Sequence, residues 1–301
     1  MVTRQRGIVL SLVGGDYRVF YEDGVIVASI RGRLKRTEGD RVLVGDIVTV
    51  GVHQDGSATI EEVAERRSLL RRRTPGKVRG IRLVAANVDQ VVVVGSAERP
   101  RWNPQIMDRF VVVAEASQLS VLVVVNKADL VEDARALAAT YLNVGYGVVV
   151  TSVPDEVGID ALRRELVGKV SLFTGSTGVG KSALLNAVQP GLRLRTGELS
   201  RSGSGRHTTV AAEMHPLDGG GFVVDTPGLR DIGLWAVDPT EVSAAFPEFS
   251  PFISGCRFDD CRHLHEPDCA VVAATTRGDI SEARLRSYRT LLEEAMEAAE
   301  Y

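Results

Sequence analysis

The first part of the chain alternates short apolar runs with turn sequences. β-branched residues dominate five segments, namely 7–11, 17–21, 25–29, 46–50 and 58–63. Each segment has the composition of a β-strand, and Gly-Asp or Asp-Gly turns separate several of them. About five strands in so short a stretch predict a small barrel. The oligonucleotide-binding (OB) barrel is the commonest of these, although an SH3-like barrel would give a similar pattern.

From about residue 83 to 232 the pattern changes. Continuous apolar runs occupy 91–95, 121–126, 147–151, 169–175 and 221–225. Such runs are typical of strands buried on both faces of a parallel sheet. Helices are expected between them, over 106–116, 132–142, 159–167 and 181–188. This alternation indicates an α/β domain, which is followed by a short helical region and a charged helix over 280–300.

Length and composition are those of a globular protein. A chain of 301 residues corresponds to about two domains or three small ones. The hydrophobic share of 44% and charged share of 25% exclude a largely disordered chain or a collagen-like fibre. No apolar run approaches the roughly 18 residues of a membrane span, so we expect no membrane contact. The charged start lacks a following apolar segment, so we expect no signal peptide and a cytoplasmic protein.

Charge is unevenly distributed, although the net charge is only −3. Residues 1–80 hold 15 basic and 10 acidic side chains, whereas residues 231–301 hold 6 and 14. The basic front end indicates an anionic partner, unless arginine is simply the preferred surface cation. The arginine-rich stretch at 64–80 is either a phosphate-contacting arm or a solvated tether.

The strongest chemical motif is Gly-Ser-Thr-Gly-Val-Gly-Lys-Ser at residues 175–182, which matches a phosphate-binding loop (P-loop). It follows an apolar strand and precedes a helix, as that motif requires. Backbone N–H groups and the helix N-terminus would hold the phosphates, Lys181 would bridge the β- and γ-phosphates, and Ser182 would ligate Mg²⁺. The expected nucleotide-binding residues are Gly175, Ser176, Thr177, Gly178, Val179, Gly180, Lys181 and Ser182.

A second apolar strand ends in Asp-Thr-Pro-Gly at residues 225–228. Alone this sequence could be only a turn. After a P-loop it indicates a γ-phosphate sensor, with Asp225 beside the Mg²⁺ ion and the Gly228 amide on the phosphate.

A third apolar strand ends in Asn-Lys-Ala-Asp at residues 126–129, which indicates a guanine reader. An aspartate carboxylate accepts from both N1–H and the exocyclic amine of guanine, a pair that adenine does not offer. The expected base-binding residues are Asn126, Lys127, Ala128 and Asp129, with backbone donors from Thr151 and Ser152. Together with the P-loop, this motif favours GTP over ATP.

The order of the motifs is itself informative. An ordinary GTPase has the P-loop first, then the phosphate sensor, then the guanine reader. Here the reader at 126 precedes the P-loop at 175, and the sensor at 225 comes last. This order predicts a circularly permuted domain with the same sheet, because the termini of such a domain lie close together. The segment after Gly228 then leads directly into the C-terminal region.

Residues 195–210 occupy the position of the first switch and are rich in Gly, Ser and Arg, so we expect this segment to be ordered by nucleotide. Thr208 or Thr209 would add a Mg²⁺ ligand there. Leu229 stands where small GTPases carry the glutamine that orients water, and a leucine side chain cannot do so. His207 is therefore the candidate catalytic residue beside Lys181, unless it is only a loop residue that bonds the backbone.

All three cysteines lie near the C-terminus, at positions 256, 261 and 269. With one histidine they form a Cys₃His set, which is typical of a closed structural zinc site. The spacing leaves either His263 or His265 as the fourth ligand. Three free buried thiols are the simpler alternative.

The barrel, the permuted motif order and the C-x₄-C-x-H-x₅-C pattern together resemble the RsgA family of bacterial GTPases, which act in biogenesis of the small ribosomal subunit. Stretches at 86–90, 107–110, 206–209 and 233–235 are also similar to that family. The resemblance covers nearly the whole chain, with the barrel matched least.

The resemblance implies GTP sites at residues 126–129 and 175–182, and zinc held by Cys256, Cys261, His263 and Cys269, which favours His263 over His265. Family members often carry a third threonine after His-Thr-Thr, where this chain has Val210. The choice of Mg²⁺ ligand between Thr208 and Thr209 therefore stays open, although we expect Thr209.

The predicted organisation is an OB-like, RNA-binding barrel (1–66), a basic linker (67–82), a circularly permuted P-loop GTPase domain (83–233), and a mostly helical zinc-binding domain (234–301). The resemblance implies a GTPase that acts late in small-subunit assembly, contacts its ribosomal RNA, and is stimulated by the subunit, and we expect it to be a monomer. The alternatives are an RNA-binding nucleotide switch with little turnover, or a GTPase with a non-ribosomal partner.

Overall fold

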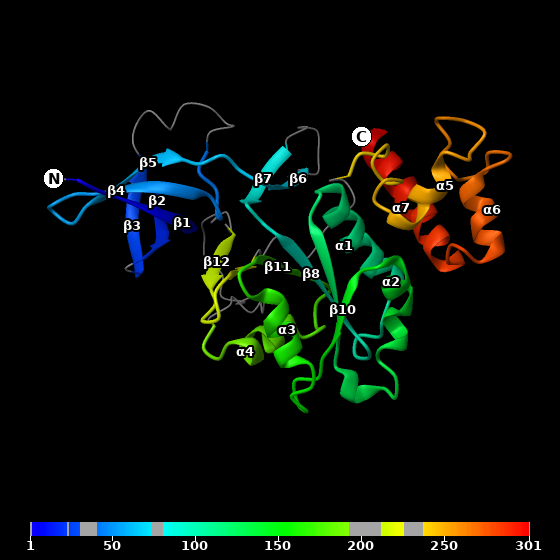
Figure 1. Cartoon of the computed structure of the whole chain (residues 1–301), viewed down its shortest axis with the longest axis horizontal. Coiled ribbons are helices and arrows are strands. Elements are labelled where there is room, and N and C mark those ends of the chain that lie inside the picture. Colours follow the sequence, from blue (N-terminus) through cyan, green and yellow to red (C-terminus); the bar gives the residue numbers. More distant parts are fainter. Residues whose placement is uncertain are drawn as a thin grey trace, which may run out of the picture.

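A barrel, an α/β unit and a helical unit follow one another along the chain, coloured blue, green and orange-to-red in Figure 1. The computed structural model describes residues 2–22, 24–30, 41–73, 81–192, 212–225 and 237–300. Within these residues, no helix combines the length and the apolar character needed to span a bilayer.

The barrel consists of the five strands that the sequence predicts. They are β1 (Thr3–Val13), β2 (Asp16–Tyr21), β3 (Gly24–Ile30), β4 (Ile47–Val52) and β5 (Ala58–Val63). The strands close in the order β1-β2-β3-β5-β4, with β3 and β5 parallel and the other pairs antiparallel. Alternate side chains such as Val19, Ala28 and Ile60 fill the interior. This closure is that of an OB-like barrel.

The segment expected to be a basic linker is partly a strand. β6 (Leu69–Arg73) pairs antiparallel with β7 (Ile81–Ala86). The interpretation as a simple solvated tether is therefore wrong for these residues, because their backbone groups are held in a two-stranded sheet.

Polar contacts bind this region to the barrel. Arg66 donates through Nε and Nη2 to the buried Asp46 carboxylate at 2.7 and 2.8 Å. Asn87, just after β7, donates from its side chain to the Gly45 carbonyl at 2.9 Å and accepts from the Arg67 amide at 2.8 Å. The connection between barrel and sheet is thus a fixed part of the structure.

The α/β unit is a six-stranded sheet in the order β10-β9-β8-β11-β13-β12. Its strands are β8 (Gln90–Ser96), β9 (Ser120–Asn126), β10 (Gly147–Val150), β11 (Val170–Thr174), β12 (Glu213–Pro216) and β13 (Phe222–Asp225). All neighbours are parallel except β12, which pairs antiparallel with β13 at the edge. The sequence predicts the five parallel strands, but β12 lacks an apolar run and is not foreseen.

Two helices cover each face of the sheet. One face packs against α1 (Pro104–Ala116) and α2 (Ala139–Val144), and the other packs against α3 (Ile159–Leu166) and α4 (Lys181–Val188). The helix expected over 132–142 is wrong in its start. Short 3₁₀ turns, η3 (Ala128–Leu130) and η4 (Ala136–Ala138), precede α2, and the Asp133 carboxylate accepts from the Ala136 amide at 3.0 Å. Such side-chain bonds to the backbone compete with a continuous helix.

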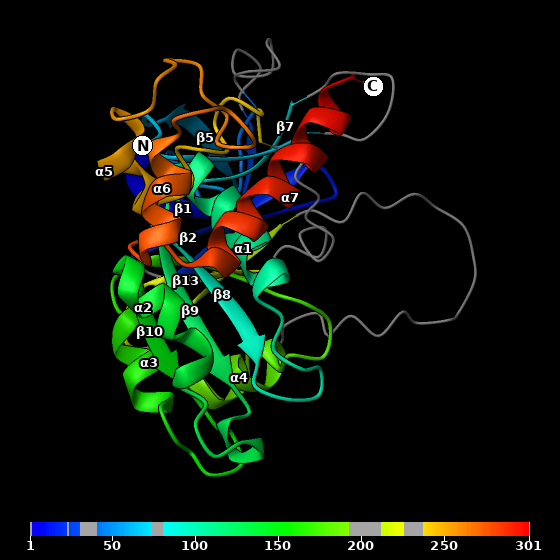
Figure 2. The same cartoon turned by 90° about the vertical axis from the view of Figure 1, so that its right-hand side faces the viewer.

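The C-terminal unit is helical. It contains η6 (Pro247–Phe249), α5 (Ser250–Ile253), α6 (Ala270–Arg277) and the long α7 (Glu282–Glu300). Figure 2 shows α7 passing in front of α1. Val112 and Val113 of α1 belong to the same apolar cluster as Phe246, Phe249 and Tyr288, so the core of this unit extends onto the sheet domain.

Candidate functional site

The P-loop connects the end of β11 to the first turn of α4. At Gly175 φ is +139°, and a Cβ added there would lie 2.1 Å from the Val94 carbonyl oxygen, so the position requires glycine. Lys181 Nζ donates to the carbonyl oxygens of Gly175 at 2.5 Å and Ser176 at 2.9 Å. The ammonium therefore lies inside the curve of the loop, beside the N-terminus of α4, where it favours an anion.

The guanine-reader motif touches the P-loop directly. Asn126 Nδ2 donates to the Val179 carbonyl oxygen at 2.8 Å, across 53 positions of sequence. Lys127 Nζ donates to the Gly178 carbonyl oxygen at 2.7 Å. A Cβ on Gly180 would lie 2.3 Å from Asn126 Nδ2, so a glycine permits this approach. The two motifs form one site in spite of their permuted order.

The segment that follows β10 contacts the predicted guanine-binding residues through the side chains of Thr151 and Ser152. Thr151 Oγ1 donates to Asn126 Oδ1 at 3.0 Å, which fixes the orientation of that amide. Ser152 Oγ lies 2.8 Å from Asp129 Oδ1 and 3.1 Å from Asp155 Oδ2, and its single proton serves one carboxylate at a time. Thr151 and Ser152 are buried, whereas Asp129 is exposed.

Asp225, the first residue of the predicted phosphate sensor, lies at the same edge of the sheet. β13 pairs in parallel with β11, Val224 opposite Leu172, so Asp225, the last residue of β13, lies at the strand end next to the P-loop. Ser182 lies partly buried in the first turn of α4. Five other predicted residues, together with the first-switch segment, lie outside the described residues. They are His207, Thr208, Thr209, Gly228 and Leu229.

The loop between β8 and α1 also belongs to the site, although the sequence does not predict it. Lys127 Nζ also donates to the Arg99 carbonyl oxygen, in the loop between β8 and α1. Pro100 Cδ would lie 3.7 Å from a Cβ on Gly178, so this loop packs against the P-loop. A backbone carbonyl leaves no mark in the sequence, and only the fold reveals the contact.

The three cysteines and His263 come together in the C-terminal unit. Their four ligand atoms all lie within 4.8 Å of one another. Cys256 Sγ is 3.9 Å from Cys269 Sγ and 3.6 Å from His263 Nδ1, and His263 Nδ1 is 3.3 Å from Cys269 Sγ. A tetrahedral zinc ion with bonds of about 2.0–2.3 Å separates its ligand atoms by about 3.4–3.8 Å, so the donors fit zinc.

The ligand loop is held by groups that the sequence does not single out. Burial opposes ionisation of Glu266, but its own backbone amide and those of Arg262, Leu264 and His265, the last three donating at 2.9–3.1 Å, hold its pKa at about 2. Arg289 Nε donates to the His263 carbonyl at 3.3 Å. Burial lowers the pKa of His263, which favours the neutral imidazole that ligates metals. His265 is exposed and lies outside the cluster.

Comparison with protein families finds a match to the RsgA GTPase family over residues 63–235. The small ribosomal subunit biogenesis GTPase RsgA of Gemmatimonas aurantiaca is 46% identical over 304 residues, covering 98% of this chain and 99% of the relative. The protein of the same name from Moorella thermoacetica is 40% identical over 292 residues, covering 96% and 97%.

Solved structures are similar over the same extent. The crystal structure of YjeQ from Thermotoga maritima has a TM-score of 0.82 and 36% identity, covering 98% of this chain and 99% of that one. YloQ, described as a circularly permuted GTPase, has a TM-score of 0.77 and 30% identity, covering 98% and 96%. The likeness extends across all three units of the fold.

Proposed function

The chain belongs to the RsgA GTPase family, and we propose that it hydrolyses GTP to GDP and phosphate while acting late in assembly of the small ribosomal subunit. The observation that carries this proposal is the contact between reader and P-loop, through Asn126 and Val179. It creates one guanine-nucleotide site from motifs in permuted order.

Within this site, Asp129 would accept from the two donors of guanine, and the Lys127 stem would lie along the base. Asn126 is oriented for its role by Thr151 and by the P-loop carbonyl. The P-loop amides and Lys181 would bind the phosphates. The contacts of Lys181 with loop carbonyls support this role, because an ammonium in that place can exchange them for phosphate oxygens.

Hydrolysis requires a divalent cation as well as the protein. We propose Ser182, Asp225 and Thr209 as the residues near Mg²⁺, with Thr208 as the alternative to Thr209, and the Gly228 amide on the γ-phosphate. A bound Mg²⁺ neutralises developing charge on the phosphates. His207 would then orient the attacking water, since Leu229 has no polar atom for that task.

The Cys₃His cluster would hold one zinc ion with a structural role. Four protein ligands leave no open position for a substrate, so the ion would tie the ligand loop to the start of α6, where Cys269 is the N-cap, and take no part in hydrolysis. The lowered pKa of the buried His263 and the loop bonds to Glu266 and Arg289 support that assignment.

The OB-like barrel is the part of the chain that we propose to contact ribosomal RNA, in a monomeric cytoplasmic protein. OB barrels bind oligonucleotides, and the basic excess in residues 1–80 fits a phosphate backbone. The relatives' names state a role in biogenesis of the small ribosomal subunit, which supplies the partner.

Turnover measurements test the proposal. GTP hydrolysis is expected to be slow in the isolated protein and much faster with purified small ribosomal subunits, and large subunits serve as the control. Guanine-nucleotide binding with negligible turnover under both conditions would indicate an RNA-binding switch. Slow turnover that small subunits leave unchanged would indicate a GTPase with another partner.

A further inference from the structure

The barrel packs against the strand pair β12–β13, which borders the candidate nucleotide site. β12 begins at Glu213 and β13 ends at Asp225, and these two residues are opposite one another in the antiparallel register. Met214 of β12 is buried in the same apolar cluster as Leu10 of the barrel. Figure 1 shows β12 next to the blue barrel strands. Barrel and strand pair therefore share one interface.

Aromatic packing fixes the barrel strand that faces this pair. Phe20 of β2 meets Phe222 of β13 edge to face, with ring centroids 5.7 Å apart and planes at 80°. Two residues earlier on β2, Arg18 Nη1 lies 3.4 Å from Glu213 Oε1. The side chains of Arg18 and Glu213 are 44% and 25% exposed, so the ion pair lies at the rim of the interface.

The ion pair between Arg18 and Glu213 changes the charge next to Asp225, at the edge of the candidate nucleotide site. Opposite residues of antiparallel strands project to the same face of the sheet, so Glu213 and Asp225 are neighbouring carboxylates. Like charges placed directly opposite destabilise a strand pair, and a second carboxylate also opposes the approach of a phosphate. Arg18 offsets the charge of Glu213.

We propose that Arg18 is a positioning residue of the nucleotide site: by neutralising Glu213 it supports binding of a nucleoside triphosphate over a diphosphate beside Asp225. The inference rests on the proposed role of Asp225 as phosphate sensor. A triphosphate brings one more anionic phosphate to that edge of the sheet than a diphosphate does, so it is the more sensitive to an uncompensated carboxylate.

The test measures the affinity of the full-length protein for a non-hydrolysable GTP analogue and for GDP, with Mg²⁺ at low salt. Arg18→Ala is expected to weaken binding of the analogue about 2- to 5-fold, the range for an exposed ion pair, with little change for GDP. Adding Glu213→Gln to that variant removes the carboxylate that needs neutralising, so the double variant is expected to regain analogue affinity. The loss in Arg18→Ala is expected to shrink in high salt.

Arg4→Ala is the matched control, because Arg4 pairs with Glu61 at 2.8 Å within the barrel. Equal losses for analogue and GDP, or a double variant as weak as Arg18→Ala, would mean that Arg18 acts only through barrel packing and would overturn the inference. A wild-type protein that binds neither nucleotide would instead contradict the proposed function, so the two failures are distinct.

Discussion

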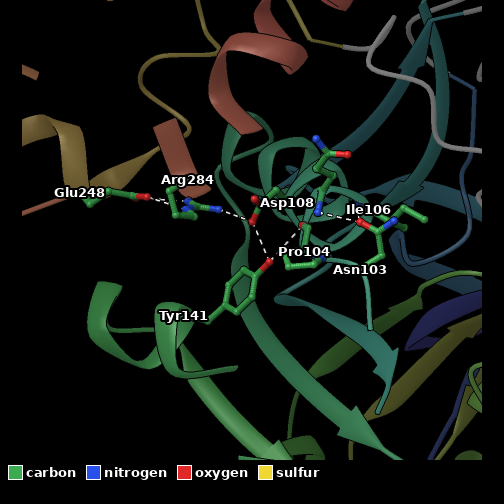
Figure 3. A network of polar contacts seen from close by, with 8 residues as sticks. Asn103, Pro104, Ile106, Asp108, Tyr141, Glu248 and Arg284 are labelled. Carbon is green, nitrogen blue, oxygen red and sulfur yellow. Dashed lines mark hydrogen bonds and ion pairs between the residues drawn. The ribbon is translucent and has the colours of Figure 1, made fainter. Parts of the chain in front are cut away.

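The Arg284 guanidinium of α7 donates to the Asp108 carboxylate of α1, and these side chains are only 2% and 1% exposed (Figure 3). The same guanidinium donates to both Glu248 carboxylate oxygens, at 2.6 and 3.2 Å, and lies 4.4 Å from the centre of the Phe246 ring. Tyr141 Oη donates to Asp108 at 2.7 Å. Burial alone would lower the pKa of Arg284, but the two carboxylates raise it and keep the group cationic. This network joins the C-terminal unit to α1 and α2.

Removing the cation from this network is expected to destabilise the protein strongly. Arg284→Met leaves the buried Asp108 and the partly buried Glu248 without this cation, which costs about 3–5 kcal/mol in comparable sites. Urea denaturation of the full-length protein measures the loss. Arg286→Met is the control, since Arg286 forms an exposed pair with Glu282 on the same helix and is expected to change stability by less than about 1 kcal/mol. A loss in Arg284→Met no larger than in the control would show that the network is not important for stability.

The sequence predicts the parts of the fold that depend on local pattern. The five barrel strands, the five parallel strands and helices α1, α3, α4 and α7 follow from apolar periodicity, with bounds that differ by a few residues. The nucleotide motifs can also be recognised in the sequence. Their glycines Gly175 and Gly180 are required because each has a positive φ and a neighbouring residue lies too close for a side chain. Strong local signals therefore carry both the fold class and most of the candidate site.

Contacts between residues far apart in the chain cannot be predicted from the sequence in the same way. Arg284 and Asp108 are 176 positions apart, and although Asp108 lies in the family-like stretch 107–110, nothing in the sequence pairs the two residues. β12 and β6 are short edge elements whose stability comes from their partners, so their own residues give little sign of a strand. The seating of the barrel on β12 likewise depends on tertiary packing.

Removing a zinc ligand is expected to affect the C-terminal unit selectively. Cys261→Ala should lower both zinc content and thermal stability, because three ligands hold the ion poorly and the ligand loop depends on it. Intrinsic nucleotide affinity should persist, since residues 126–129 and 175–182 belong to the sheet domain. Metal analysis and thermal unfolding measure the two effects.

His265→Ala is the matched control for the zinc prediction, because His265 neighbours the cluster and lies outside it. It should retain the metal. Wild-type protein purified without chelator that contains no zinc would refute the assignment of the cluster as a zinc site.

Stimulated hydrolysis is expected to depend on His207. The His207→Ala variant should lose about 10²–10⁴-fold of the turnover measured with small subunits, as when a water-positioning or general-base group is removed. GTP affinity should barely change, because the P-loop and guanine reader are intact. Leu229→Gln should not raise the intrinsic rate to that of an ordinary small GTPase. His53→Ala, in the barrel, is the control. Full stimulation in His207→Ala would mean that the partner itself positions the water.

Guanine selectivity is expected to rest on the Asp129 carboxylate. Asp129→Asn replaces an acceptor with an amide NH₂ that opposes a guanine donor but suits the carbonyl of xanthine, so GTP should bind on the order of 100-fold more weakly and xanthosine triphosphate more tightly. The fold should survive, because Ser152 Oγ, 2.8 Å from Asp129 Oδ1, can donate equally well to an amide oxygen. Asp155→Asn makes the same chemical change at the other carboxylate near that hydroxyl, 3.1 Å away, and should leave the preference for GTP intact. Competition between GTP and xanthosine triphosphate, measured in both variants, tests this assignment. If Asp155 reads the base, Asp155→Asn and not Asp129→Asn would lose the preference for GTP. If no carboxylate reads the base, neither variant would lose it.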